Sequence, residues 1–257
     1  MALKRPLILI TNDDGISAPG IKVLVEIIKE LGEVVVIAPD KPQSGMGHAI
    51  TMNHTIRIRK ENFHNVLDEY SSTGTPVDCV KLAINKLLPR KPDLIVSGIN
   101  HGSNLSISVI YSGTMSAAVE GAIEGIPAIG FSLCDHAINA DFTACKPYVK
   151  KITEQVLKNG LPSGCCLNVN IPALGEKEIR GIKFCRQTKG YWIEELDERK
   201  DPSGVPYFWL TGSFLNLEKE NQNTDVWACD NGYVAVVPVH FDMTMNEAFK
   251  ELEKWEN

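Results

Sequence analysis

Short apolar runs alternate along most of the chain with segments whose apolar residues recur at helical spacing. Runs rich in Val, Ile and Leu are typical of strands buried on both faces of a parallel sheet. The predicted strands are 7–11, 33–38, 93–97, 127–132 and 166–172, and the predicted helices are 20–31, 76–88, 115–124 and 141–158. This alternation predicts an α/β fold, a doubly wound and mostly parallel sheet with helices on both faces.

Two parts of the chain follow other patterns. Residues 50–60 alternate polar and apolar positions, which predicts a half-exposed strand. Residues 189–224 are aromatic and polar without helical periodicity, and a structureless loop of that length is improbable in a compact domain. We therefore expect this segment to be an arm or hairpin that packs on another subunit, the alternative being that it folds back over its own sheet. Extended residues 179–188, a hairpin around Asp230-Asn231-Gly232 and a terminal helix over 245–257 are also predicted.

The chain length of 257 residues suits one α/β domain with an elaboration. We expect a catalytic core over residues 1–178. Residues 179–257 are expected to form a C-terminal extension of arm, hairpin and helix that is not an independent domain.

Charge and composition narrow the class of protein. The net charge is −6 and no long basic run occurs, which argues against a nucleic-acid partner but leaves a small phosphorylated substrate open. The N-terminal apolar run is too short for a signal sequence, and no stretch reaches transmembrane length. The 7 cysteines are scattered, with no C-x-x-C pair. We expect a cytoplasmic protein with reduced thiols and no membrane contact.

Polar side chains follow the ends of three predicted strands. Asp13 and Asp14 come directly after the first, Ser44 lies in the loop after the second, and Asn100 lies just beyond the third. The carboxyl ends of parallel strands are where open sheets bind ligands. Two adjacent carboxylates repel each other, and a divalent cation would relieve that repulsion. Two carboxylates, a hydroxyl and an amide oxygen suit Mg²⁺ or Mn²⁺ rather than zinc. Taken singly, however, each of these residues is also common in ordinary turns and loops.

A second candidate site precedes the helix predicted at 115–124. Ser112, Gly113 and Thr114 stand where the first amides of that helix lack intrahelical partners. Such an N-terminus binds anions, phosphate above all, and Gly113 would allow close approach to the backbone. Simple N-capping by Ser112 or Thr114 is the alternative, and it is compatible with phosphate binding.

A metal beside a phosphate-binding helix end indicates phosphate-ester hydrolysis. The chain has no G-x-x-x-x-G-K-[ST] motif, which disfavours an ATPase, and no G-x-G-x-x-G after the first strand, which disfavours a dinucleotide dehydrogenase. Covalent phosphatases of the haloacid dehalogenase type use D-x-D, and the adjacent Asp13-Asp14 pair departs from that pattern.

Several blocks in order resemble the survival protein E (SurE) family of metal-dependent 5′(3′)-nucleotidases. The blocks are ITNDDGISAPGI, VIAPDKPQSGMGHAIT, STGTPVDCV, PDLIVSGINHGSNL, VIYSGTMSAAVEG and TDVWACDNGYVAVVP. The resemblance implies a Rossmann-like core, a swapped C-terminal arm, a homodimer or homotetramer, and dephosphorylation of nucleoside monophosphates. It implies one divalent metal per subunit on four ligands, which are Asp13, Asp14, Ser44 and Asn100.

The roles of the remaining candidates stay open. Asn12 is placed with Asp13 and Asp14 among the catalytic candidates, and Gly98 with the substrate-binding ones. His48 and His101 flank the proposed metal loops, and each is either a proton donor or, as we favour, a pocket-lining residue. The nucleophile is either a metal-bound water, our first choice, or one of the two aspartates.

Three other functions compete with a 5′-nucleotidase. An exopolyphosphatase or a general phosphomonoesterase would use the same residues, and a non-catalytic nucleotide sensor would use the metal and anion site only to bind. An intact set of four metal ligands favours an enzyme over a sensor. The sequence does not choose the base, or between 5′ and 3′ esters.

Overall fold

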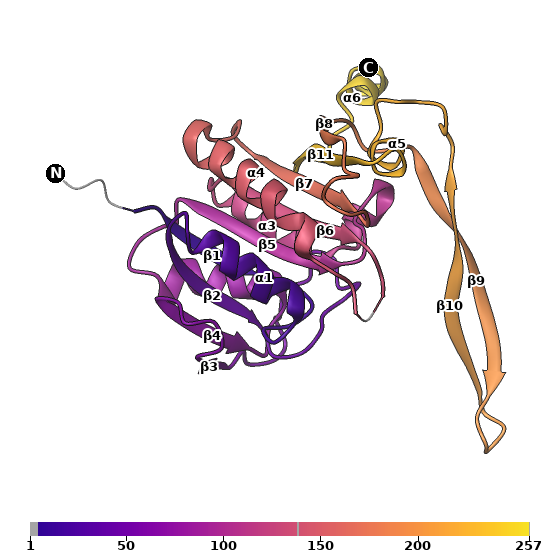
Figure 1. The fold of residues 1–257 in the computed structure, drawn as a ribbon. Helices are drawn as coiled ribbons and strands as arrows, with labels where there is room; N and C mark the ends of the chain where they lie inside the picture. The colour runs from indigo at the N-terminus through magenta and orange to yellow at the C-terminus, as the bar shows by residue number, and fades with distance from the viewer. Residues whose placement is uncertain (1–4, 138, 257) are drawn as a thin grey trace.

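The computed structural model describes residues 5–137 and 139–256 (Figure 1). Its strands are β1 (Leu7–Thr11), β2 (Glu33–Pro39), β3 (Ile58–Lys60), β4 (Asp68–Ser72), β5 (Leu94–His101), β6 (Ala128–Cys134), β7 (Cys165–Pro172), β8 (Gly181–Phe184), β9 (Gly190–Lys200), β10 (Pro206–Asn216) and β11 (Tyr233–His240). Its α-helices are α1 (Pro19–Ile28), α2 (Pro76–Leu82), α3 (Gly113–Ile123), α4 (Lys146–Asn159), α5 (Asp225–Asp230) and α6 (Asn246–Leu252).

Nine of these strands form one sheet in the order β3-β4-β2-β1-β5-β6-β7-β11-β8. Its pairings are parallel except at β3–β4 and β7–β11. Helices α1 and α4 pack on one face, and α2 and α3 pack on the other. The predicted doubly wound α/β fold is therefore confirmed.

The order of the strands reverses at β1, which lies between β2 and β5. All five residues of β1 are buried, because helices cover the sheet on both sides. A doubly wound sheet opens a crevice at such a reversal, outside the carboxyl ends of the strands. The segments after β1 and β5 begin at this crevice, so the fold brings the sequence candidates to one edge.

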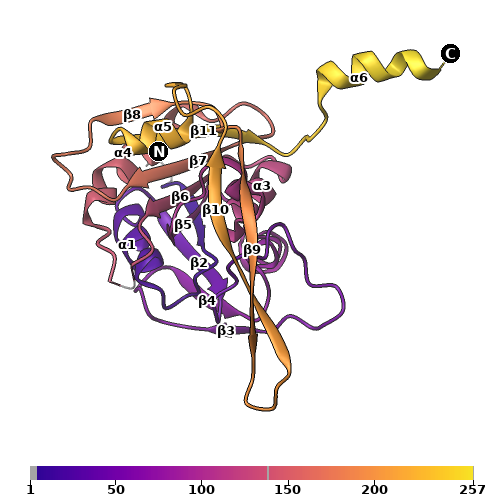
Figure 2. The same cartoon turned by 90° about the vertical axis from the view of Figure 1, so that its right-hand side faces the viewer.

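The C-terminal part of the chain is built differently. Strands β9 and β10 pair antiparallel over all eleven residues and form an arm that projects from the sheet (Figure 1). Helix α6 has no buried residue and extends away from the sheet (Figure 2). Strands β8 and β11 lie in the nine-stranded sheet although they follow residue 178. The division of the chain at that residue stays a prediction.

Three sequence predictions need correction. The hairpin expected around Asp230 is wrong: 225–230 is helix α5, and Gly232, with φ at +79°, leads directly into β11. The Asn231-Gly232 pair, which is typical of turns, here ends a helix, and the Asn231 backbone amide donates to the Trp227 carbonyl. Within 50–60 only Ile58–Lys60 is a strand, and β4, which pairs with β2, was not foreseen. Asn100 lies inside β5 and not beyond it.

None of the helices in the described part of the chain has the length and apolarity needed to cross a membrane.

Candidate active site

The acidic pair lies at the carboxyl end of β1. Asp13 is 3% exposed and Asp14 is half-buried. The Asn12 side-chain nitrogen donates to the Gly15 carbonyl at 2.9 Å and closes the turn that holds the pair. The Asn12 Oδ1 atom is buried and accepts no hydrogen bond from any described residue. A buried oxygen without a donor, beside two carboxylates, is typical of a site that binds a cation or water.

Asp13 is hydrogen-bonded to two other segments of the chain. Its Oδ1 atom accepts a hydrogen bond from the Thr114 hydroxyl at the start of α3, and its carbonyl accepts one from the Gln43 amide at 2.7 Å. Burial raises the pKa of Asp13 to about 6, although the Thr114 hydrogen bond lowers it. Among the residues that the structure describes, no cationic side chain offsets the burial of this carboxylate.

Asp14 is fastened to β5. Its Oδ2 atom accepts a hydrogen bond from the His101 amide at 3.1 Å. Burial raises the pKa of Asp14 as well. The neighbouring Asn100 donates its side-chain nitrogen to the Gly102 carbonyl at 2.7 Å, so its oxygen is the atom that a cation would use. Two residues earlier, Gly98 has φ at +125°, and a Cβ there would lie 2.3 Å from the Phe131 carbonyl oxygen, so only glycine fits.

The N-terminus of α3 faces the same acidic pair. Ser112 caps the helix, since its hydroxyl accepts from the Met115 amide at 3.0 Å, whereas Thr114 bonds to Asp13. A Cβ on Gly113 would lie 2.7 Å from the Cβ of Asp13. Glycine thus allows the helix end to approach the carboxylate closely, and the capping expected from the sequence exists beside it.

The loop that contains Ser44 is exposed and is anchored at both sides. Beside Ser44, Gln43 bonds to Asp13, and farther along Gly47 donates to the Tyr111 carbonyl at 3.1 Å. The His48 Nε2 atom lies 3.0 Å from an oxygen of Glu120, a carboxylate that is 2% exposed. Glu120 follows Thr114 by six residues, or about 9 Å along α3, so its bond to His48 lies well away from the helix N-terminus.

The structure brings some sequence candidates into direct contact and leaves others apart. Asp13 contacts Thr114 and Asp14 contacts His101, which joins β1, β5 and α3 at one edge. Ser44 and Asn100 do not contact the pair directly, but their neighbours in the chain do. Gln43 bonds to Asp13, and His101 bonds to Asp14. Gly113 packs closely on Asp13, whereas the remaining candidates bond to or pack on other groups; these are Asn12, Gly98, Ser112 and His48.

Glu120 was missed at the sequence level. Both its oxygens are bound, one by His48 and the other by Lys81 of α2. A lone carboxylate among the small residues of α3 was the available signal, because burial of such a group requires partners.

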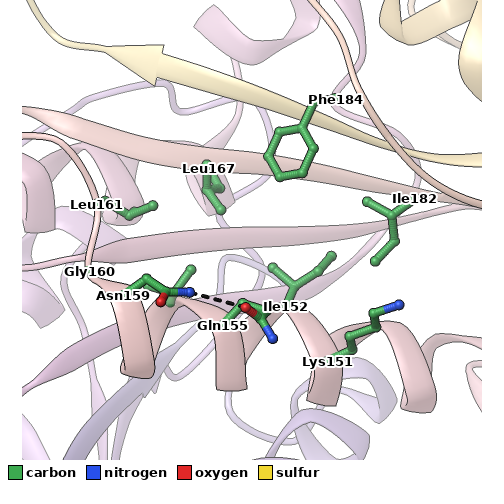
Figure 3. Close-up of a pocket in the computed structure, with 10 residues that line it drawn as sticks. Lys151, Ile152, Gln155, Asn159, Gly160, Leu161, Leu167, Ile182 and Phe184 are labelled. Carbon is green, nitrogen blue, oxygen red and sulfur yellow. Dashed lines mark hydrogen bonds between the residues drawn. The ribbon is translucent and has the colours of Figure 1, made fainter.

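A cavity of about 260 Å³ adjoins the acidic pair. It is lined by Asp14, Ala18, Pro19, Gly20, His101 and Phe142. A larger cavity of about 420 Å³ lies elsewhere, where Ile152 of α4, Leu167 of β7 and Phe184 of β8 line it (Figure 3). The larger cavity is mainly apolar and lies apart from the acidic pair, so it does not belong to the candidate active site.

The donor atoms at the edge fit a hard divalent cation. No three His, Cys, Asp or Glu side chains in the described ranges 5–137 and 139–256 come together as a metal-binding group. A cation here would be held by two carboxylates and neutral oxygens, the chemistry that Mg²⁺ and Mn²⁺ prefer.

The fold and this edge define a Rossmann-like α/β protein with its ligand site at the strand-order reversal. A family model described as Survival protein SurE matches residues 8–194, and the chain belongs to the SurE family. A protein of Flavobacterium psychrophilum named 5′-nucleotidase SurE is 59% identical over 255 residues, 99% of each chain. One of Christiangramia forsetii with the same name is 60% identical over 259 residues, which cover 99% of this chain and 98% of that protein.

A solved structure has the same fold. The crystal structure of the SurE protein from Aquifex aeolicus matches with a TM-score of 0.85 and 41% identity, and it covers 98% of this chain and 100% of that one. The Rossmann-like core and the family membership expected from the sequence are therefore confirmed.

Proposed function

We propose that this protein is a metal-dependent phosphomonoesterase that hydrolyses nucleoside 5′-monophosphates to nucleoside and phosphate, with 3′-monophosphates as a second ester class. The enzyme class, 5′-nucleotidase, is confirmed by full-length relatives of that name. The observation that supports the metal-dependent mechanism is the contact of buried Asp13 with the N-terminus of α3, since it joins a cation-binding carboxylate to an anion-binding helix end.

The residues divide into two sets. Asp13, Asp14, Ser44 and Asn100 would hold one Mg²⁺ or Mn²⁺ per subunit. When bound, this cation supplies positive charge that polarises a phosphoryl oxygen and makes water a stronger acid. The amides of Gly113 and Thr114, at the positive end of α3, would bind the other phosphate oxygens. The helix end would hold the phosphate group beside the buried carboxylate of Asp13.

We assign proton transfer to the residues around Asp13 and Asp14, and not to His48. The His48 Nε2 atom is engaged by Glu120, which gives this histidine a role in fastening the Ser44 loop. Water is the proposed attacking group, because direct attack by Asp13 or Asp14 would compete with their ligation of the cation. Asn12 would orient that water through its free buried Oδ1 atom.

The test is a phosphate-release screen over nucleoside 5′- and 3′-monophosphates, short polyphosphate and p-nitrophenyl phosphate. EDTA should abolish release, and Mg²⁺ or Mn²⁺ should restore it. The variant Asp14→Asn should lose most of the phosphate release. Its matched control is Asp230→Asn, a change of an exposed aspartate at the end of α5, which should keep full activity. Full activity in metal-free protein would contradict the mechanism. Nucleotide binding without phosphate release would indicate a sensor, and faster release from polyphosphate would indicate an exopolyphosphatase.

We also propose a homodimer or homotetramer. The arm exposes large apolar side chains, among them Leu196, Phe208, Trp209 and Leu210. Apolar and aromatic side chains of this kind are enriched at the centres of subunit interfaces. Light scattering that gives 28.3 kDa, the mass of one chain, at micromolar concentration would contradict the proposal.

A further inference from the structure

Two cysteines that the proposed reaction does not use lie against each other. Cys134 ends β6 and Cys229 lies in α5, 95 residues later in the chain. Their Sγ atoms are 3.9 Å apart, in van der Waals contact. The same small apolar cluster contains Cys185, Ala228 and Ala235.

The two thiols differ in access. Cys229 is 8% exposed, and its Sγ atom also donates to the Asn170 carbonyl at 3.6 Å, which holds it in place. Cys134 is half-buried, so a small oxidant can reach it. The contact with Cys134 and burial together raise the pKa of Cys229 well above its ordinary value, so this sulfur stays a thiol at neutral pH.

We propose that Cys134 and Cys229 are a site of oxidative modification that forms an intramolecular disulfide with a peroxide as oxidant. The Cys134 sulfur attacks one peroxide oxygen, the O–O bond breaks, and a sulfenic acid and one water form. The Cys229 sulfur then attacks the Cys134 sulfur, the S–O bond breaks, and a second water leaves with the thiol proton. Two thiols are oxidised by two electrons, and one hydrogen peroxide is reduced to two waters.

The disulfide would join β6, which lies beside the candidate active site, to α5, which lies where the β9–β10 arm leaves the sheet. In β6, Ser132 and Leu133 pair with Asn100 and His101 of β5, immediately before Cys134. In α5, the Asp225 carboxylate accepts hydrogen bonds from the Ser106 amide at 2.8 Å and the Thr188 amide at 2.9 Å, beside β9. A disulfide between these elements closes a loop that contains the whole arm. Closing a long loop restricts the unfolded chain more than the folded one.

The sequence allows the linkage to be mapped without ambiguity. Cleavage before aspartate gives fragments 93–134 and 225–229, each of which ends in its own single cysteine. Cys79 falls on fragment 78–92, and the other four cysteines fall on fragment 141–196. The wild-type protein is treated with dilute hydrogen peroxide, its free thiols are alkylated, and it is digested without reductant. The expected product is fragment 93–134 linked to fragment 225–229.

Serine variants assign the bond. Cys134→Ser and Cys229→Ser should each lose the linked product, whereas Cys185→Ser and Cys145→Ser, as matched controls, should keep it. Because Cys229 is buried, its variant can fail to fold, and the half-exposed Cys134→Ser then decides the test. Linkage of either fragment to 141–196, or oxidation of Cys134 with no link to 225–229, would overturn the proposal.

Thermal unfolding supplies a readout that does not depend on the nucleotidase activity. Oxidised wild-type protein should unfold several degrees above the reduced protein, and Cys134→Ser should show no shift. A linked protein with an unchanged unfolding temperature would overturn the inferred joining of β6 to the base of the arm.

Discussion

Strand β1 and the β9–β10 arm both have many apolar residues, yet their surroundings are opposite. All five residues of β1 are buried between helices on both faces of the sheet. In the arm, Trp192, Leu196, Phe208 and Leu210 are between 44% and 67% exposed. A strand of a parallel sheet is apolar because helices of the same chain cover both of its faces, and a projecting hairpin has no such cover.

The arm nevertheless has an organised apolar face. Cross-strand pairs place Trp192 opposite Phe214 and Leu196 opposite Leu210, and Phe208 lies two residues from Leu210 on the same side. The Trp192 and Phe214 rings make an edge contact, with centroids 5.9 Å apart. A two-stranded hairpin alone in water is only marginally stable. The comparison teaches that the core is buried within one chain, whereas the apolar face of the arm is exposed and would be covered only in the proposed homo-oligomer.

The largest effect is expected from Asp13→Asn, which changes the core site and leaves the arm intact. We expect phosphate release to fall at least about 100-fold, equivalent to about 2.7 kcal/mol in the barrier, with the fold retained. Loss of one ligand charge weakens a cation site without removing the Thr114 contact. Steady-state kinetics with saturating Mn²⁺ measures the change. Activity within tenfold of the wild-type protein would refute an essential role for this carboxylate.

The pH dependence of stability probes the same carboxylate in metal-free protein. Burial raises the pKa of Asp13 from an ordinary 3.8 to about 6, so the folded state retains a proton that the unfolded state releases first. Stability should therefore fall as the pH rises from about 4 to about 6, by about 3 kcal/mol from this group. Urea unfolding at several pH values measures it.

Asp13→Asn is the matched variant for that titration, because it removes the titrating group. The variant should lose most of the slope between pH 4 and 6. An equal slope in the variant and the wild-type protein would assign the dependence to other groups, Asp14 first among them.

A smaller effect on stability is expected from Gly113→Ala. The new Cβ would lie 2.7 Å from the Cβ of Asp13, so the helix end and the carboxylate must separate, at a cost of about 1–3 kcal/mol. Gly175→Ala is the control, because its Cβ would meet only the flexible end of Glu178. Thermal unfolding and phosphate release should both decline in the first variant and neither in the second. Unchanged behaviour of Gly113→Ala would argue against close packing of α3 on the site.

The smallest effect on the fold is expected from Leu210→Glu in the arm. An exposed substitution far from the core should change the stability of the subunit by less than about 0.5 kcal/mol. The charge on the apolar face should nevertheless release monomers of 28.3 kDa, which light scattering detects. Ser213→Glu, on the opposite face of β10, is the matched control and should weaken assembly less. An unchanged oligomer in Leu210→Glu would place the subunit contact elsewhere, for instance at α6.

The sequence by itself determined what depends on neighbouring residues. Buried strands were evident from apolar runs such as 7–11, and helix α1 from its periodicity. The acidic turn at Asp13-Asp14 and the small-residue helix predicted at 115–124 were also local signals. Because carboxyl ends of parallel strands share one edge, even the meeting of β1 and β5 could be anticipated.

Only the tertiary structure decided what depends on residues far apart in the chain. Helix α5 replaced an expected hairpin because Ala228 and Cys229 are buried beside β11, and this burial outweighs the local turn signal. The contacts of Thr114 with Asp13 and of Glu120 with His48 join segments that are 101 and 72 residues apart. No local propensity encodes such pairs, because their free energy arises only when packing brings the groups out of water together.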